Sequence, residues 1–200
     1  KKIIIFSVSN NNKTMDDFLQ SRSFCIIKCE LLSREIIEYI KNEVNKTLEM
    51  NKTTNVVRNL HDISTWTELN DLWHGIEKFC LLNFPLAMKD MYFSHKTYGG
   101  IMISNAPLNV KNHQKWHRDT EYKSYTVCIP LVPVNEKNGC TQILPNTLEA
   151  LPKSWRKYYS NSMNMECDLG NIVIFDGRIL HRGLKNTTQL NRPILIGTMS

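Results

Sequence analysis

The sequence predicts a mostly β fold, a sandwich or barrel of short strands with helices in the first half of the chain. Two observations lead to this prediction. From Tyr98 onward, short apolar runs alternate with turn residues such as Asn138-Gly139 and Asp176-Gly177, which is typical of all-β folds. Before that point, two longer stretches carry apolar side chains at helical spacing. Most of the later runs are too close together for intervening helices, which argues against a doubly wound parallel sheet.

The length and composition predict one globular domain. The chain has 200 residues, 42% hydrophobic and 22% charged, which excludes collagen-like, coiled-coil and largely disordered proteins. We expect a single domain with a helical and strand support region over about residues 1–98. A β core carrying the functional site follows over about residues 99–200.

The first elements of the chain are a strand, a turn and a second strand. Residues 3–6 are apolar but too short for the core of a signal peptide and lack a cleavage site, so we expect a strand. Asn10-Asn11-Asn12 predicts a solvated turn. Residues 23–32 alternate imperfectly between apolar and polar side chains, as a short strand does.

Two helices are expected next. Ser33 is a suitable N-cap for an amphipathic helix that ends near Leu48. Residues 51–65 are polar and irregular. A second helix is expected from about Thr67 to Met88, with Pro85 interrupting it because proline lacks the amide hydrogen that a helix needs. The strands expected after it are 101–103, 125–134, 141–144, 172–175 and 194–198.

The cysteines and the hydropathy indicate a reduced, intracellular protein, which we place in the cytoplasm as a monomer. The six cysteines are scattered and form no C-x-x-C pair, so neither a disulfide scaffold nor a cysteine zinc knuckle is expected. No apolar stretch approaches the roughly 20 residues of a membrane span.

The positive charge does not by itself indicate nucleic-acid binding. Lys and Arg number 25 against 19 Asp and Glu, a net charge of +6, which is the balance of many nucleic-acid-binding domains. The lysines, however, are interspersed with Asn and Thr, and no block of five basic residues occurs. We therefore expect no nucleic-acid partner, although the charge can attract anionic substrates.

The chemistry is concentrated in two segments of the second half. In an extended strand, His117 and Asp119 of Trp116-His117-Arg118-Asp119 point to the same face. His181 follows a later apolar strand. Two histidines and one carboxylate on one face of a metal, with the other positions open, form the facial triad of non-haem Fe(II) oxygenases. Arg192, eleven residues beyond His181, has a planar fork suited to a carboxylate.

Each of these residues also has a structural alternative. His117, Asp119 and His181 could form a hydrogen-bonded cluster in the core, and Arg192 a surface salt bridge. His113 lies four residues before His117, so the two could bind zinc if this segment were a helix. The strand-like context around Trp116 argues against that helix.

At these residues the sequence resembles the Fe(II)/2-oxoglutarate-dependent dioxygenases, and within them the phytanoyl-CoA dioxygenase-like family. The resemblance spans about residues 16–200 and is most specific in residues 116–120 and 170–192. The chain departs from the family at Pro145-Asn146-Thr147-Leu148, where Pro-Gly-Ser-His is usual, and at Gly170-Asn171, where Gly-Asp is usual. These departures leave the three candidate ligands in place.

The resemblance implies a double-stranded β-helix core, the jelly-roll or cupin-like fold. His117, Asp119 and His181 would hold Fe(II), and Arg192 would pair with the far carboxylate of the co-substrate 2-oxoglutarate. Thr126 and Cys128 share a strand face, so they line the co-substrate pocket or point away from it together; their position in the family pattern favours the pocket.

The implied activity is an oxygenase that uses O2 to hydroxylate an unidentified small-molecule substrate, with release of succinate and CO2. The alternative from another functional class is a non-catalytic or nucleic-acid-associated binding domain on the same β scaffold. A pure binding domain has no need for the triad and Arg192 at these spacings, which favours the oxygenase.

Overall fold

The computed structural model describes residues 5–6, 12–50, 58–59, 67–91, 102–106, 112–148 and 159–200, without side chains for 5–6, 12–15, 43–50, 58–59, 67–70 and 102–106. The helices of this described part are α1 (Asn12–Arg22), α2 (Arg34–Met50) and α3 (Thr67–Asn83). Its strands are β1 (Ile5–Phe6), β2 (Phe24–Lys28), β3 (Arg58–Asn59), β4 (Met102–Ala106), β5 (Tyr125–Pro130), β6 (Thr141–Leu144), β7 (Met163–Met165), β8 (Asn171–Asp176), β9 (Leu180–Gly183) and β10 (Arg192–Met199).

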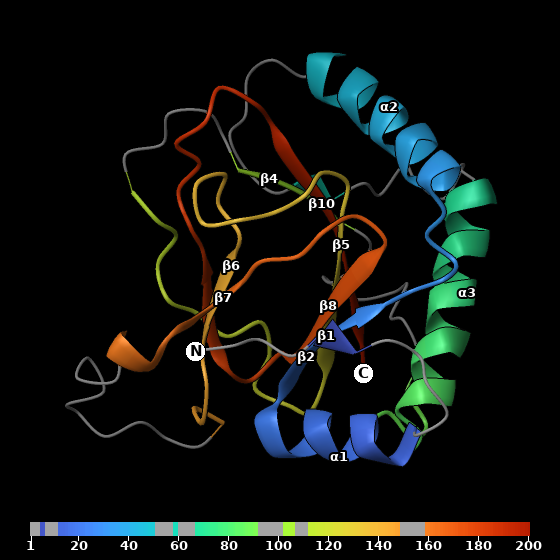
Figure 1. The fold of residues 1–200 in the computed structure, drawn as a ribbon, viewed down its shortest axis with the longest axis vertical. Coiled ribbons are helices and arrows are strands. Elements are labelled where there is room, and N and C mark those ends of the chain that lie inside the picture. Colours follow the sequence, from blue (N-terminus) through green and yellow to red (C-terminus); the bar gives the residue numbers. More distant parts are fainter. Residues whose placement is uncertain are drawn as a thin grey trace.

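The strands form two sheets, which is the architecture of a jelly roll. The larger sheet has the order β1-β2-β8-β5-β10-β4-β3, and the smaller has the order β7-β6-β9. All neighbouring pairs are antiparallel except β1 and β2. In the middle of the large sheet, from β2 to β4, neighbouring strands are not consecutive in the sequence, as in the jelly roll that the resemblance implied. Figure 1 shows the small sheet on one side of the large one and α2 and α3 on the other.

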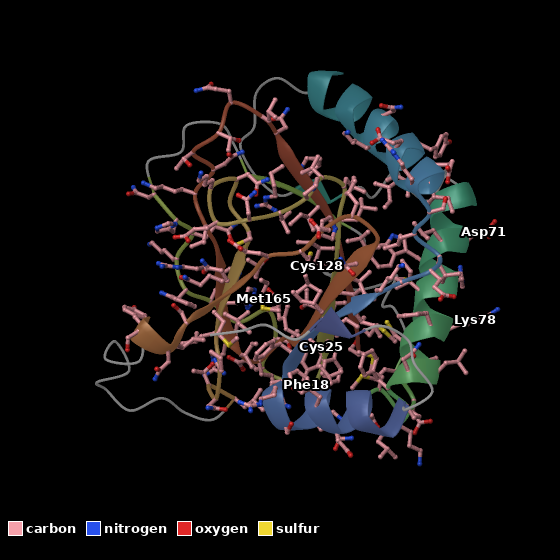
Figure 2. All side chains as sticks on the ribbon, in the orientation of Figure 1. Phe18, Cys25, Asp71, Lys78, Cys128 and Met165 are labelled. Carbon is pink, nitrogen blue, oxygen red and sulfur yellow. The ribbon has the colours of Figure 1, made fainter. Side chains whose placement is uncertain are left out.

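Each face of the large sheet packs against a different layer because side chains alternate along a strand. In β5, Val127 and Ile129 belong to the core that the sheet forms with the helices. Cys128, one residue along, belongs to a second core together with Ile143 and Met165 of the small sheet. In Figure 2, Cys128 and Met165 lie inside the molecule, whereas Asp71 and Lys78 project from the outer side of α3. Thr126 and Cys128 therefore both face the space between the two sheets.

Most expected elements are confirmed, and their ends follow local chemistry. The amide of Ile36 donates to Ser33 Oγ at 3.3 Å, so Ser33 caps α2 as expected. Helix α3 ends at Asn83, two residues before Pro85, rather than at Met88. The turn after it is fixed by Asp16, whose carboxylate oxygens accept the amides of Leu86 and Ala87, each at 2.9 Å.

Four elements were not predicted. Asn12 lies in α1 rather than in the expected turn, and this helix has few apolar residues apart from Phe18 and Leu19. Strands β7 and β9 have three and four residues, too few for an alternating pattern to be recognised in sequence. Of the irregular stretch expected at 51–65, the structure describes Arg58–Asn59 as β3, and the rest lies outside the described residues. Among the described helices, none has the length and apolarity needed to cross a membrane.

The helix–sheet core predicts unequal costs for two leucines of α3. Leu72 is 8% exposed and Leu82 is 70% exposed. We expect Leu72→Ala to lower the free energy of unfolding by about 2–5 kcal/mol, because it removes buried methyl groups and leaves a cavity. Leu82→Ala is the matched control, with a change of at most about 0.5 kcal/mol. Urea unfolding followed by circular dichroism measures both, and equal losses would contradict this packing.

Candidate metal centre

The structure brings His117, Asp119 and His181 together from two segments. His117 and Asp119 lie between β4 and β5, and His181 lies in β9. The amides of His117 and His181 donate to each other's carbonyls, both at 3.0 Å. This pair is an isolated bridge rather than the continuous strand that we expected around His117. The bridge nevertheless places both imidazoles on the same side of the backbone.

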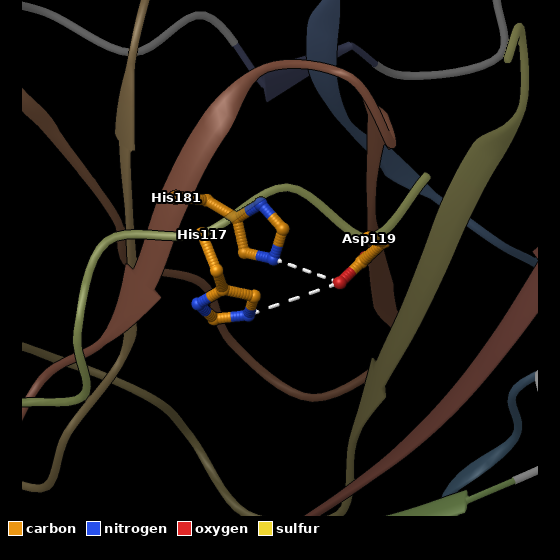
Figure 3. A group of neighbouring side chains, drawn as sticks. All are labelled: His117, Asp119 and His181. Atoms are coloured by element: carbon orange, nitrogen blue, oxygen red, sulfur yellow. Dashed lines mark ion pairs between the residues drawn. The ribbon is translucent and has the colours of Figure 1, made fainter. Parts of the chain in front are cut away.

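The side-chain atoms of the three residues converge on one point (Figure 3). Asp119 Oδ1 lies 3.2 Å from His181 Nε2 and 3.8 Å from His117 Nε2. All three potential ligand atoms lie within 4.8 Å of one another, and no other group of three His, Cys, Asp or Glu in the described part of the chain does so. Ligands on one face of an ion, each about 2.1 Å from it, lie about 3 Å apart. The distances of 3.2 and 3.8 Å from Asp119 to the two histidines are close to this, so a single metal ion fits with small movements of the rings.

Hydrogen bonds to the backbone set the tautomer of both histidines. His117 Nδ1 lies 2.8 Å from the carbonyl oxygen of Lys115, and His181 Nδ1 lies 3.1 Å from that of Ile179. A carbonyl only accepts, so Nδ1 carries the proton in each neutral ring, and Nε2 presents its lone pair. Two nitrogen lone pairs and a carboxylate oxygen therefore face one another. A bound cation relieves this convergence of acceptors.

Thr126 holds the carboxylate of Asp119 from the other side. Its Oγ1, on β5, donates to Asp119 Oδ2 at 2.6 Å, which leaves Oδ1 toward the histidines. Burial alone would raise the pKa of Asp119, but the hydrogen bond and charge that His181 offers when its ring is protonated, then Thr126 and His117, lower it below its usual value. Asp119 is therefore ionised at neutral pH, as a metal ligand requires. The described contact of Thr126 is with this carboxylate, a role the sequence did not suggest.

The turn between β8 and β9 accepts hydrogen bonds from the backbone at Asp119. The amides of Asp119 and Thr120 both donate to the carbonyl of Gly177, at 2.8 and 3.3 Å. A Cβ atom at Gly177 would lie 2.5 Å from Ser124 Oγ and 2.9 Å from Thr120 Oγ1, which is too close for any side chain. Gly177 is a positioning residue that sequence reasoning treated only as part of a turn.

The outward-facing Arg118 is fastened to the same turn. Its guanidinium donates to the carbonyl of Arg178. Arg178 in turn forms a two-pronged ion pair with the buried Asp176, with Nε–Oδ1 and Nη2–Oδ2 distances of 2.9 and 2.7 Å. Such a fork fixes geometry more firmly than a single contact does. The ligand segment is thus tied to the turn on its outer side as well.

Arg192 is buried at the start of β10, with 4% of its surface exposed. Strand alternation and the pairing of Cys128 with Ile196 place Arg192, Ile196 and Cys128 on the face toward the small sheet. Burial lowers the pKa of Arg192 to about 10. The alternative of a surface salt bridge is therefore wrong, and Cys128 and Thr126 point into the interior rather than away from it.

The helical zinc alternative is also wrong. Residues 112–120 are not helical, and His113 Nδ1 accepts the amide of Lys185 at 3.0 Å. This histidine instead fastens the ligand segment to the residues after β9. Because its lone pair is used there, Nδ1 of His113 is not available to a metal.

Comparison with known proteins points to one family. The family model described as "Phytanoyl-CoA dioxygenase (PhyH)" matches residues 33–194. Comparison of the sequence with curated proteins gives no match.

Solved structures share this fold at low sequence identity. AviO1 from Streptomyces viridochromogenes Tue57 matches with a TM-score of 0.74 and 14% identity, covering 96% of each chain. The epimerase SnoN, in complex with Fe3+, alpha ketoglutarate and nogalamycin RO, matches with a TM-score of 0.76 and 11% identity over 94% of this chain and 82% of its own. EvdO2 from Micromonospora carbonacea var. aurantiaca, complexed with 2-oxoglutarate, matches with a TM-score of 0.71 and 13% identity over 100% of this chain and 94% of its own.

The close approach at Gly177 predicts that even a methyl group disturbs the centre. We expect Gly177→Ala to cost about 1–3 kcal/mol in unfolding free energy, because Ser124 and Thr120 must move, and to weaken Fe(II) binding through displacement of Asp119. The matched control is Gly75→Ala in α3, where the added Cβ would meet only the flexible tip of Leu31 at 3.2 Å. Because alanine favours helix, this control should be neutral or slightly stabilising. Equal effects in urea unfolding and metal titration would show that Gly177 is not constrained.

Proposed function

Because the chain belongs to the phytanoyl-CoA dioxygenase family, we propose that it is a 2-oxoglutarate-dependent oxygenase that hydroxylates a small molecule. In this proposal His117, Asp119 and His181 hold Fe(II), and Arg192 binds the co-substrate. The single observation that carries it is the convergence of two imidazole Nε2 atoms and one carboxylate oxygen within 4.8 Å. Two histidines and one carboxylate, with the remaining positions open, suit Fe(II) in oxygen chemistry.

The residues of the chain bind and orient rather than react. The two Nδ1–carbonyl bonds fix the rings of His117 and His181, and Thr126 fixes the carboxylate of Asp119 so that a single oxygen faces the ion. When bound, Fe(II) supplies the coupling of O2 reduction and 2-oxoglutarate decarboxylation to oxidation of the substrate. The side chain of His117 is 43% exposed and that of His181 is 7% exposed, so the group faces solvent on the side of His117, where a substrate can approach.

Arg192 suits the far carboxylate of 2-oxoglutarate. A buried guanidinium loses much of its hydration, and a carboxylate bound to its planar fork would offset part of that cost. Cys128 lies near Arg192 and contributes a small, weakly polar side chain there. Its pKa is raised by burial, so the thiol stays neutral and does not compete with the co-substrate for Arg192.

The structural neighbours support a small-molecule substrate and leave the outcome of oxidation to experiment. SnoN is described as an epimerase solved with nogalamycin RO, and SnoK as a carbocyclase. Hydroxylation with release of succinate and CO2 is thus our proposal for this chain. The alternative of a non-catalytic or nucleic-acid-associated binding domain offers no reason for three acceptors to converge. All six cysteines are free and buried, which supports the proposal of a reducing, cytoplasmic location.

Anaerobic addition of Fe(II) and 2-oxoglutarate tests the proposed centre. We expect a weak visible charge-transfer band, since the co-substrate would chelate the iron directly. His181→Ala should abolish the band, and Leu82→Ala, far from the centre on α3, should leave it unchanged. A wild-type protein without the band, or a His181→Ala variant that keeps it, would contradict the proposal.

The role of Arg192 predicts a selective loss of co-substrate affinity. We expect Arg192→Gln to weaken 2-oxoglutarate binding about 10- to 100-fold, because a charge-assisted, two-pronged contact is lost. Arg192→Lys keeps the charge without the planar fork, so its affinity for 2-oxoglutarate should lie between those of the wild type and of Arg192→Gln. Fe(II) affinity without 2-oxoglutarate should not change. Titration calorimetry distinguishes the two ligands, and a loss of Fe(II) affinity with unchanged 2-oxoglutarate affinity would reverse the assignment.

A further inference from the structure

The residues next to two of the ligands form a contact of their own on the outer side of the backbone. Because His117 pairs with His181 in an antiparallel bridge, Trp116 stands opposite Arg182. Side chains alternate, so these two point away from the proposed metal. The guanidinium carbon of Arg182 lies 4.6 Å from the centroid of the Trp116 ring, which is the geometry of a cation–π contact.

Both members of this contact are braced by further side chains. Arg182 Nε donates to Gln142 Oε1 at 2.9 Å, and Gln142 Nε2 donates to Asn164 Oδ1 at 2.7 Å. These residues are direct partners across β9, β6 and β7. The ring of Tyr159 stacks on Trp116 with centroids 5.5 Å apart and an interplanar angle of 9°. A row of side chains therefore runs from the small sheet to the ligand segment.

The backbone joins the ligand segment to β9 through three hydrogen bonds. Beyond the two hydrogen bonds of the bridge, the amide of Gln114 donates to the carbonyl of Gly183 at 2.9 Å. The amide of Gly183 is taken by the Gln114 side chain rather than by the ligand segment's backbone. With 43% of its side chain exposed, His117 is not fixed by core packing. The distance between its Nε2 and that of His181 depends on how firmly this segment lies against β9.

We propose that Arg182 and Trp116 are positioning residues for the metal, a clasp that keeps His117 at ligating distance from His181 and Asp119. The inference rests on the proposed function, and neither side chain touches metal or substrate. It explains why an arginine immediately follows His181 with its head group over an aromatic ring, although a cation beside a metal site is electrostatically unfavourable.

That electrostatic cost makes the test directional. Removing a positive charge near a cation site strengthens metal binding by Coulomb's law. Loosening the clasp weakens it, because His117 then samples orientations that cannot bind. The sign of the change in affinity therefore separates a positioning role from a bystander charge.

The experiment measures Mn(II) affinity of the apoprotein by titration calorimetry and by the electron paramagnetic resonance signal of free Mn(II). We expect Arg182→Gln to weaken binding about fivefold, and Arg182→Lys, which keeps a cation for the ring, to stay within about twofold of wild type. Trp116→Leu should weaken binding as much as Arg182→Gln does, and Trp116→Phe should weaken it less. The double variant Arg182→Gln/Trp116→Leu should bind no more weakly than the worse single variant, because both break one contact.

Lys123→Gln is the charge-matched control, since this exposed lysine lies near the ligand segment outside the row. It should bind Mn(II) as wild type does or slightly more tightly. Unchanged or tighter Mn(II) binding by both Arg182→Gln and Trp116→Leu would overturn the inference. A double variant whose loss of Mn(II) affinity equals the product of the two single losses would overturn it as well. Thermal unfolding of each apoprotein identifies variants that do not fold, in which case Arg182→Lys and Trp116→Phe carry the comparison. If the wild-type protein does not bind Mn(II), or if His181→Ala binds it as the wild type does, the metal site itself is contradicted.

Discussion

Two backbone hydrogen bonds between His117 and His181, each 3.0 Å long, are the constraint on which the centre depends. They join a segment outside both sheets to a strand inside the small one, and they set both imidazoles on the same side. Further contacts position Asp119 relative to this bridge. Asp119, two residues after His117, donates its amide to the carbonyl of Gly177. Its carboxylate accepts a hydrogen bond from Thr126 of the large sheet. The three proposed ligands thus come from one loop and one strand, but both sheets position them.

The two cores place different side chains on the two faces of the large sheet. The helices cover one face of the large sheet with a fully apolar core, where Trp73 and Phe84 have no exposed surface. The inner face forms a second core with the small sheet. Because the helix core already buries much apolar surface, the inner face can also carry polar groups such as Thr126 and Arg192, whose burial is costly.

The strands, and the convergence of His117, Asp119 and His181 that we propose as a metal centre, were predictable because each leaves a local signal. Apolar runs bounded by turns located β5, β8 and β10, and the spacing of His117 and Asp119 suggested one shared face. The residues that organise these ligands leave no such signal. Thr126 resembles any strand threonine, and only the fold brings its hydroxyl to Asp119. Gly177 is one of many turn glycines until Ser124 and Thr120 surround it, and the contact of Trp116 with Arg182 depends on a bridge between distant segments. Helix α1 escaped prediction because its stability comes from docking rather than from an apolar stripe.

Iron stoichiometry measured together with succinate formation in the wild-type protein and in Asp119→Ala tests the central claim most directly. If the convergence of Asp119 with two imidazoles creates one Fe(II) centre, the wild type binds one iron per chain and forms succinate from 2-oxoglutarate. Asp119→Ala, with the same fold by circular dichroism, then loses both tight iron binding and succinate formation. Asp119→Ala that still binds one iron and turns over 2-oxoglutarate at the wild-type rate would contradict the account.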